Sequence, residues 1–223
     1  MGGAVGGPPL SGAPDLAELL AGPVVPAARG LLGCLLRSGG VALRLTEVEA
    51  YAGHGGDPAS HAHRGRTPRN AVMFGPPGYA YAYFTYGMHW CLNVVCGRPG
   101  EASAVLLRAG AVVGGVAAAR ARRPTARRDA ELARGPARLC LALGIDGTAN
   151  GTSLLDGSGP IALAPPTSPV DVALIQVGPR VGVAGGHDTP WRFWLAGEPS
   201  VSAYRRQVRR RPDNRMQAPD AHG

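Results

Sequence analysis

Three residues with catalytic potential, Glu47, Glu49 and Tyr51, recur at every second position near the end of segment 41–51. This spacing is that of a β-strand, whose alternate side chains lie on one face. The preceding alternate positions of the same predicted face are apolar: Val41, Leu43 and Leu45. A face that begins apolar and ends with two carboxylates and a phenol predicts a strand that runs from the core into the floor of a cleft.

Carboxylates beside a phenol in a cleft suit the hydrolysis of a glycosidic bond in a nucleotide. This reaction passes through an oxocarbenium-like transition state, and a carboxylate can activate water and stabilise the positive charge. Glu49 is our candidate for this role, and Glu47 is an alternative because spacing alone does not choose between them. The competing structural explanation is a surface carboxylate that pairs with an arginine.

The segment Tyr79–Cys96 predicts one β-hairpin. Its first strand alternates alanine with three tyrosines, Tyr79, Tyr81 and Tyr83. Gly87 suits a tight turn, and the β-branched and aromatic residues of 90–96 suit the returning strand. Tyr86 falls at or near the tip, where it has no core to enter, so it could act as a wedge between stacked bases. A ladder of half-buried tyrosines on an ordinary strand is the alternative.

The charge of the chain favours a polyanionic partner. Basic residues number 23 against 15 acidic ones, for a net charge of +8, and this favours nucleic acid over a membrane surface. All the basic residues are arginine, so no side-chain amine is available for Schiff-base chemistry. No apolar run is long enough to span a membrane, no signal peptide opens the chain, and the four cysteines have no disulfide-framework spacing.

A metal site is a weaker possibility. His61 and His63, with Asp57, provide imidazole and carboxylate groups of the kind that bind zinc. The surrounding loop, 54–70, has no cysteine and is rich in glycine and arginine, so we predict no metal. The glycine-rich segments form no G-x-G-x-x-G motif after a strand, which argues against a nucleotide cofactor.

The remaining pattern predicts an α+β fold, with helices packed on an antiparallel sheet. We expect helices at 16–21, about 26–37 and 136–144, and a further strand at 103–108. Short apolar runs follow at 153–155, 160–163, 170–177, 180–183 and 191–195. The predicted domain covers residues 14–206, between a disordered Gly/Pro-rich segment, 1–13, and a flexible basic tail, 207–223.

Several short motifs occur in a consistent order between about residue 15 and residue 206. They include Thr46–Tyr51, Asp57–His61, Thr67–Asn70, Tyr83–Met88, Leu92–Asn93, Val105–Arg108, Pro179–Val183 and Trp191–Trp194. In sequence and order they resemble the alkyladenine (3-methyladenine) DNA glycosylase family. The resemblance implies a single mixed domain around a curved antiparallel sheet with a protruding hairpin, and catalysis without a metal or organic cofactor.

The resemblance also implies roles for individual residues. Glu49 would be the general base on the attacking water, and Arg108 would support both that water and Glu49. Tyr51, His61 and Tyr83 would enclose the flipped base.

Two further residues would select the base and contact the DNA helix. Asn93 would exclude the exocyclic amine of normal guanine, and Tyr86 would be the inserted wedge. The implied enzyme is a monofunctional glycosylase of base excision repair, which acts on 3-methyladenine, 7-methylguanine, hypoxanthine and ethenoadenine in double-stranded DNA and leaves an abasic site. We expect a monomer in the bacterial cytoplasm, with no membrane partner.

Two other functions are considered. A non-catalytic nucleic-acid-binding module could stack bases on the tyrosines of the hairpin. A nucleosidase could act on free nucleosides, but small substrates require neither a wedge nor a charge of +8.

Overall fold

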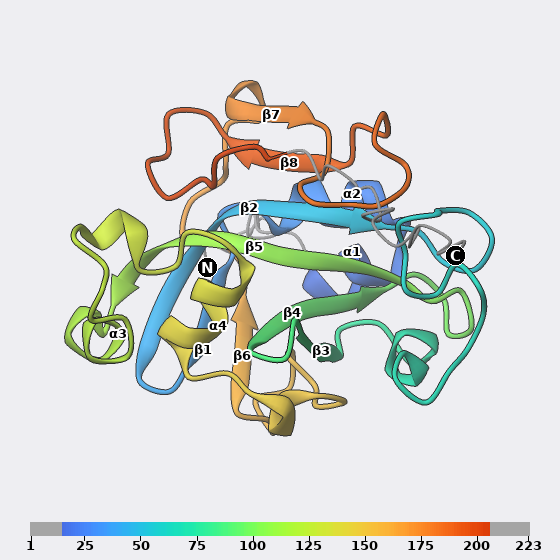
Figure 1. Ribbon diagram of the computed structural model, residues 1–223, viewed down its shortest axis with the longest axis horizontal. Coiled ribbons are helices and arrows are strands. Elements are labelled where there is room, and N and C mark those ends of the chain that lie inside the picture. Colours follow the sequence, from blue (N-terminus) through green and yellow to red (C-terminus); the bar gives the residue numbers. More distant parts are fainter. Residues whose placement is uncertain (1–14, 206–223) are drawn as a thin grey trace, which may run out of the picture.

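Strand β2 (Val41–Tyr51) lies at the centre of a curled antiparallel sheet in the computed structural model, which describes residues 15–205 (Figure 1). The main strand order is β3-β4-β5-β2-β1-β6, and β8 joins β2 beyond the end of β1, with β7 outside it. The other strands are β1 (Leu35–Ser38), β3 (Ala80–Thr85), β4 (His89–Cys96), β5 (Ser103–Gly114), β6 (Ile161–Ala164), β7 (Ile175–Gly178) and β8 (Arg192–Leu195). The α+β prediction is therefore confirmed.

The helices are short and pack on the long central strands. They are α1 (Leu16–Ala21), α2 (Val24–Leu31), α3 (Val116–Arg122) and α4 (Pro136–Leu143), with 3₁₀ turns η1 (Ala71–Phe74), η2 (Asp129–Glu131), η3 (Gly147–Ala149) and η4 (Val172–Leu174). Helix α2 contacts β2 and β5, whereas α4 contacts β4 and β5, and both contribute to one apolar core. None of the helices within 15–205 is long and apolar enough to cross a membrane.

Helix ends follow the local sequence signals. The Asp15 side chain accepts a hydrogen bond from the Ala17 N–H at 2.9 Å and caps α1. Pro136 occupies the first turn of α4, and Gly144 ends that helix in the left-handed region, with φ of 67°. These boundaries agree with the predicted ones.

The predicted helix at 26–37 is wrong in its second half. Helix α2 ends at Leu31, and residues 35–38 form β1, which pairs with β2. Gly39 and Gly40 connect the two strands with φ of 54° and 77°, the pattern of a tight hairpin turn. A short apolar run fits either a helix or a buried strand, so leucine spacing alone did not distinguish them.

The predicted face of β2 is also wrong, because the strand contains a β-bulge. Its pairing with β5 shifts on both sides of Glu47, and Thr46 has no partner in the ladder. Core residues occur on both sides of this irregularity: Val41, Leu43, Leu45, Val48 and Ala50. A bulge inserts an extra residue, so the core-facing residues change from odd-numbered positions before the bulge to even-numbered positions after it. Glu47 and Glu49 therefore lie on the face opposite to the core-facing Val48 and Ala50.

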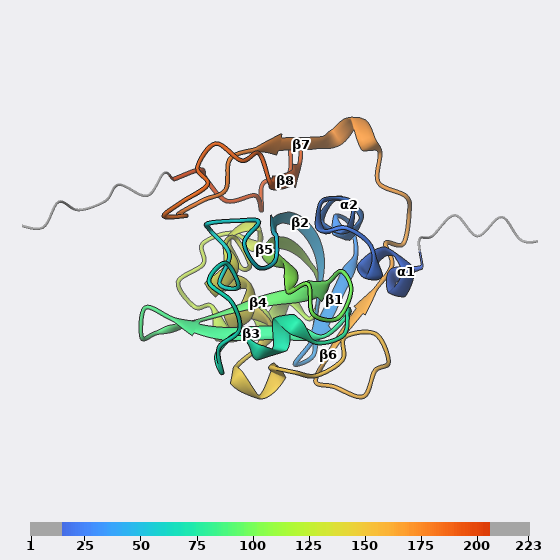
Figure 2. The ribbon, with the colours of Figure 1, turned by 90° about the vertical axis from the view of Figure 1, so that its right-hand side faces the viewer.

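Hairpin β3–β4 projects from the body of the protein, as predicted (Figure 2). Thr85 pairs with His89, so Tyr86, Gly87 and Met88 form the loop between the strands. The predicted strand at 103–108 is longer and continues to Gly114, whereas the predicted apolar run at 180–183 is a loop. Our expectations for segments 1–13 and 207–223 concern chain outside the described residues.

Candidate active site

A pocket of about 390 Å³ opens beside the hairpin, where β2, β3, β4 and β5 meet the loops around residues 60 and 182. This volume lies within the range of small-ligand sites, roughly 300–1,000 Å³. The pocket is lined by six of the seven predicted site residues: Tyr51, His61, Tyr83, Tyr86, Asn93 and Arg108. The fold thus brings together residues from segments that are far apart in the sequence.

The seventh residue, Glu49, lies directly behind the pocket lining and is fully buried. Its Oε2 accepts hydrogen bonds from the Tyr51 hydroxyl at 2.8 Å and from Arg108 Nη1 at 3.2 Å. Its Oε1 accepts a hydrogen bond from the backbone N–H of Val181 at 2.7 Å. Because all three partners line the pocket, the Glu49 carboxylate lies immediately behind the pocket wall.

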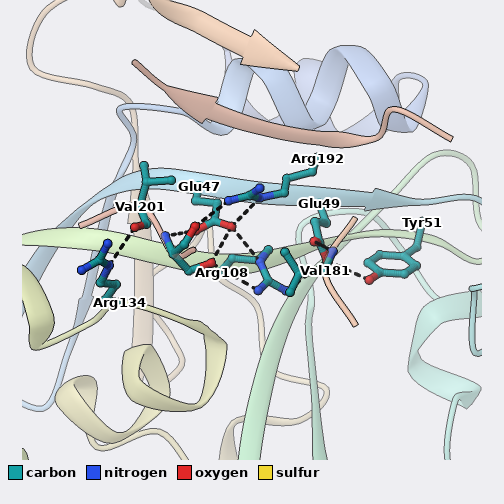
Figure 3. A network of polar contacts seen from close by, with 9 residues as sticks. Glu47, Glu49, Tyr51, Arg108, Arg134, Val181, Arg192 and Val201 are labelled. Carbon is teal, nitrogen blue, oxygen red and sulfur yellow. Dashed lines mark hydrogen bonds and ion pairs between the residues drawn. The ribbon is translucent and has the colours of Figure 1, made fainter. Parts of the chain in front are cut away.

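The location of their partners distinguishes the two carboxylates. Glu47 Oε1 accepts bonds from Arg108 Nε and Arg192 Nε (Figure 3) and from the Ser202 hydroxyl, and its Oε2 accepts one from the Ser202 N–H. Of these partners only Arg108 lines the pocket, whereas all three partners of Glu49 line it, and Glu49 keeps one acceptor position on Oε1. Glu49 is therefore the carboxylate that borders the pocket.

Arg108 lies between the two carboxylates and is almost fully buried (Figure 3). Burial disfavours its charged form, but Glu49 and Glu47 outweigh this effect and raise the pKa of Arg108. Burial and the nearby Glu49 carboxylate also raise the pKa of Tyr51 well above its usual value. At neutral pH the Glu49 carboxylate thus has a cationic donor on one side and a neutral phenol on the other.

The rings of His61 and Tyr83 pack edge to face in the pocket lining. Their ring centroids are 4.6 Å apart at an interplanar angle of 74°. His61 Nδ1 lies 3.0 Å from the hydroxyl of Tyr81, which fixes the ring. Burial, with the positive charge of Arg69, lowers the pKa of His61. The imidazole is therefore neutral at neutral pH and can stack on a base.

The tyrosines of the hairpin do not form a stacking platform. Tyr81 is only 1% exposed and belongs to a small second core with Met73, while Tyr83 faces the pocket. None of the three tyrosines on which the binding-module alternative relies, Tyr79, Tyr81 and Tyr83, is an exposed residue. The hairpin contributes pocket walls instead.

Tyr86 lies at the hairpin tip, as predicted, and is 80% exposed. Its φ of 52° and the φ of 67° at Gly87 give the loop a left-handed turn. Met88 beside it is also largely exposed. Tyr86 also lines the pocket, so an aromatic side chain projects into solvent at the pocket mouth.

Asn93 is buried on β4 and reaches the pocket from the opposite strand to Tyr81. Its side-chain amide donates a hydrogen bond to the backbone oxygen of Tyr81 at 3.0 Å. This bond fixes the orientation of the amide in the pocket wall.

The Asp57–Arg180 pair was missed by the sequence reasoning, which considered Asp57 as a metal ligand. Arg180 Nη2 donates to Asp57 Oδ1 at 2.8 Å, and Nη1 donates to the backbone oxygen of Ala50 at 2.9 Å. The guanidinium also lies 4.7 Å from the centroid of the Tyr51 ring. The Asp57 carboxylate thus pairs with an arginine. Among residues 15–205, no three potential metal-ligating side chains lie close together.

The backbone N–H of Val181 is the second group that was missed. It follows Arg180 in the chain and is held against Glu49 by the same loop. A backbone donor has no signature in residue type, so only the motif that includes both residues indicated this segment.

The acid stability of the protein should depend on Glu47. Burial by itself would raise the pKa of Glu47, but the charges of Arg108 and Arg192 outweigh it and lower the pKa below its usual 4.5. The unfolded chain therefore binds this proton at a higher pH than the folded protein does, and the free energy of unfolding should fall as the pH decreases below 4.5.

Urea titrations of the wild type and Glu47→Gln at several pH values would measure this effect. We expect the difference in unfolding free energy between the two proteins to shrink at acid pH. Asp57 also has a lowered pKa, but it titrates in both proteins and cancels in the difference. A constant difference across the acid range would contradict the prediction.

Comparison with known proteins identifies the family. A model of the family described as methylpurine-DNA glycosylase (MPG) matches residues 18–199. A protein of Nocardia farcinica is 59% identical over 187 residues, which cover 82% of this chain and 88% of that protein. A protein of Streptomyces avermitilis is 52% identical, with coverage of 87% and 93%, and one of Mycobacterium tuberculosis is 49% identical, with coverage of 86% and 95%.

Each of these three relatives is named "Putative 3-methyladenine DNA glycosylase". The matched region contains Glu49, the lining residues of the pocket and the projecting hairpin. A buried carboxylate under an aromatic pocket, in a chain of this charge, agrees with glycosidic chemistry on DNA. The chain belongs to the methylpurine-DNA glycosylase family and is a DNA glycosylase.

Proposed function

We propose that the protein hydrolyses the N-glycosidic bond of damaged purines after they have been flipped out of double-stranded DNA. The substrates would be alkylated or deaminated purines, among them 3-methyladenine, 7-methylguanine, hypoxanthine and ethenoadenine. The supporting observation is the Glu49 carboxylate, which underlies the pocket and keeps one hydrogen-bonding site on Oε1.

In this reaction Glu49 removes a proton from a water molecule as the water oxygen bonds to the anomeric carbon of the sugar. The electrons of the broken bond leave with the base, and an abasic site remains. Positive charge develops on the sugar in the transition state, and the nearby carboxylate stabilises it. Arg108 and Val181 N–H orient the carboxylate, and no lysine is required because hydrolysis forms no imine.

The base would enter between Tyr51 and the wall formed by His61 and Tyr83. Stacking on aromatic side chains recovers roughly 1–3 kcal/mol per base, which offsets part of the few kcal/mol lost on unstacking. Asn93, fixed by its bond to Tyr81, would screen against the exocyclic amine of normal guanine. A monomer is sufficient, because the described part of one chain contributes all the proposed groups.

The test is a panel of DNA duplexes, each with one defined lesion, incubated with the protein and then with hot alkali. Alkali breaks the strand at an abasic site, so breakage at the lesion reports excision. We expect breakage with at least one alkylated or deaminated purine and none with undamaged duplex. No breakage with any of these lesions would contradict the proposal and favour a non-catalytic DNA-binding protein.

Tyr86→Ala should weaken lesion processing more than it weakens binding to undamaged duplex. The tip aromatic would fill the gap left by the flipped base, and this contact exists only in the flipped complex. Single-turnover excision rates and affinities for undamaged duplex would measure the two effects. Val113→Ala is a control, because this exposed apolar side chain lies outside the pocket lining. Equal losses in rate and in undamaged-duplex affinity would argue against the wedge.

A further inference from the structure

A short C-terminal segment, residues 200–202, lies across the polar network behind the pocket. The Ser200 hydroxyl is 2.9 Å from that of Thr46, at the β-bulge of β2. The backbone oxygen of Val201 accepts a hydrogen bond from Arg134 Nε at 2.8 Å (Figure 3). We call residues 200–202 the strap. The family match ends at residue 199, so the strap lies outside the matched region.

Ser202 contacts the network with all three of its polar groups. Its N–H and its hydroxyl both donate to Glu47, at 2.7 and 2.9 Å. Its backbone oxygen accepts a hydrogen bond from Arg192 Nη2 at 2.7 Å. The same hydroxyl accepts a bond from Arg108 Nη2 at 3.4 Å. Ser202 is thus the one residue of the strap that contacts both Glu47 and Arg108.

These contacts determine the direction of Arg108. A guanidinium is planar, so fixing two of its nitrogens also fixes the third. Glu47 holds Nε and Ser202 holds Nη2, and the remaining nitrogen, Nη1, then points at Glu49 Oε2. Ser202 also orients the Glu47 carboxylate that holds Nε.

We propose that Ser202 is a positioning residue, through which the strap sets the orientation of Arg108 and thereby of the Glu49 carboxylate. The inference rests on the proposed role of Glu49 in excision. It assigns a part in the reaction to a segment that is 155 positions from Glu47 in the sequence.

The test compares Ser202→Ala with Ser200→Ala. Both variants remove a hydroxyl from the strap, but the Ser200 hydroxyl bonds to Thr46 and does not contact Arg108. We expect Ser202→Ala to lower the single-turnover excision rate roughly 10-fold, because small misplacement of catalytic groups costs up to about 100-fold. The affinity for lesion duplex should stay unchanged, and Ser202→Thr, which keeps the hydroxyl, should restore most of the rate. Ser200→Ala should leave the rate unchanged.

A double-mutant cycle separates positioning from general loosening of the fold. In an Arg108→Met background, Ser202→Ala should cause little further loss of rate, since its effect passes through Arg108. Equal rate losses in Ser202→Ala and Ser200→Ala would overturn the proposal and leave the strap a purely structural element.

A second measurement does not depend on activity. In NMR spectra, the Nε–H resonance of Arg108 should shift or broaden in Ser202→Ala. It should keep its wild-type chemical shift in Ser200→Ala. An unchanged Arg108 resonance in Ser202→Ala would overturn the inference even if the wild type excises lesions. Failure of the wild type to excise any lesion, with a shifted resonance, would count against the proposed function and not against the positioning of Arg108.

Discussion

Glu49→Gln should lower the single-turnover rate of lesion excision by about 10²- to 10⁴-fold, the usual contribution of a general base. The amide keeps the shape of the carboxylate and can still accept the Val181 N–H, but it can neither remove a proton from water nor offset the positive charge on the sugar. Alkali-dependent strand breakage at a single lesion measures the rate. The affinity for lesion duplex should change little, because the aromatic walls remain.

Glu47→Gln is the matched control, since both carboxylates lie on β2 and both bind Arg108. Only one partner of Glu47, Arg108, lines the pocket, so loss of the Glu47 carboxylate should affect the orientation of Arg108 and the stability more than the chemistry. We expect a smaller rate loss than in Glu49→Gln. A larger loss in Glu47→Gln would reverse the assignment of the base.

Arg180→Met should lower the free energy of unfolding by about 3–5 kcal/mol, the usual cost of breaking a buried ion pair by removing one partner. The side chains of Arg180 and Asp57 are both buried, and the substitution leaves the carboxylate of Asp57 without its cation. It also removes the donor to the Ala50 oxygen. Urea denaturation measures the change, with the same dependence of the unfolding free energy on urea concentration expected for the wild type and the variant.

Two further variants test this explanation. Arg44→Met breaks the Arg44–Glu198 pair, which is partly exposed, and should cost at most about 1 kcal/mol. Arg180→Met combined with Asp57→Ala should recover part of the stability, because no uncompensated buried carboxylate remains. If the double variant were as unstable as the sum of the single ones, the loss would come from packing and not from the unpaired charge.

The loss of Arg180 should also affect the pocket. Its guanidinium lies over the Tyr51 ring, and the next residue donates its N–H to Glu49. The Asp57–Arg180 pair therefore links the loop that carries His61 to the loop that contacts the candidate base. Stability and site geometry depend on the same buried contact.

The sequence by itself determined the elements whose signals are local. Alternation and turn residues gave β2 and the hairpin with Tyr86 at its tip, and capping residues gave the ends of α1 and α4. These features depend on residues only a few positions apart, so a single stretch of chain contains the necessary information. The resemblance then indicated which side chains would meet at the pocket.

Only the tertiary structure decided how the carboxylates are used. The bulge at Thr46 changes the face of the sheet on which Glu47 and Glu49 lie, and no local sequence pattern predicts the bulge. Glu49 meets Val181 132 positions away and Glu47 meets Ser202 155 positions away, so their remaining hydrogen-bonding capacity depends on long-range packing. For the same reason the sequence, from which we predicted no metal at Asp57, did not indicate that the carboxylate pairs with Arg180. Residue types supply donors and acceptors, but a buried polar group acquires its chemistry from the partners that the complete fold brings to it.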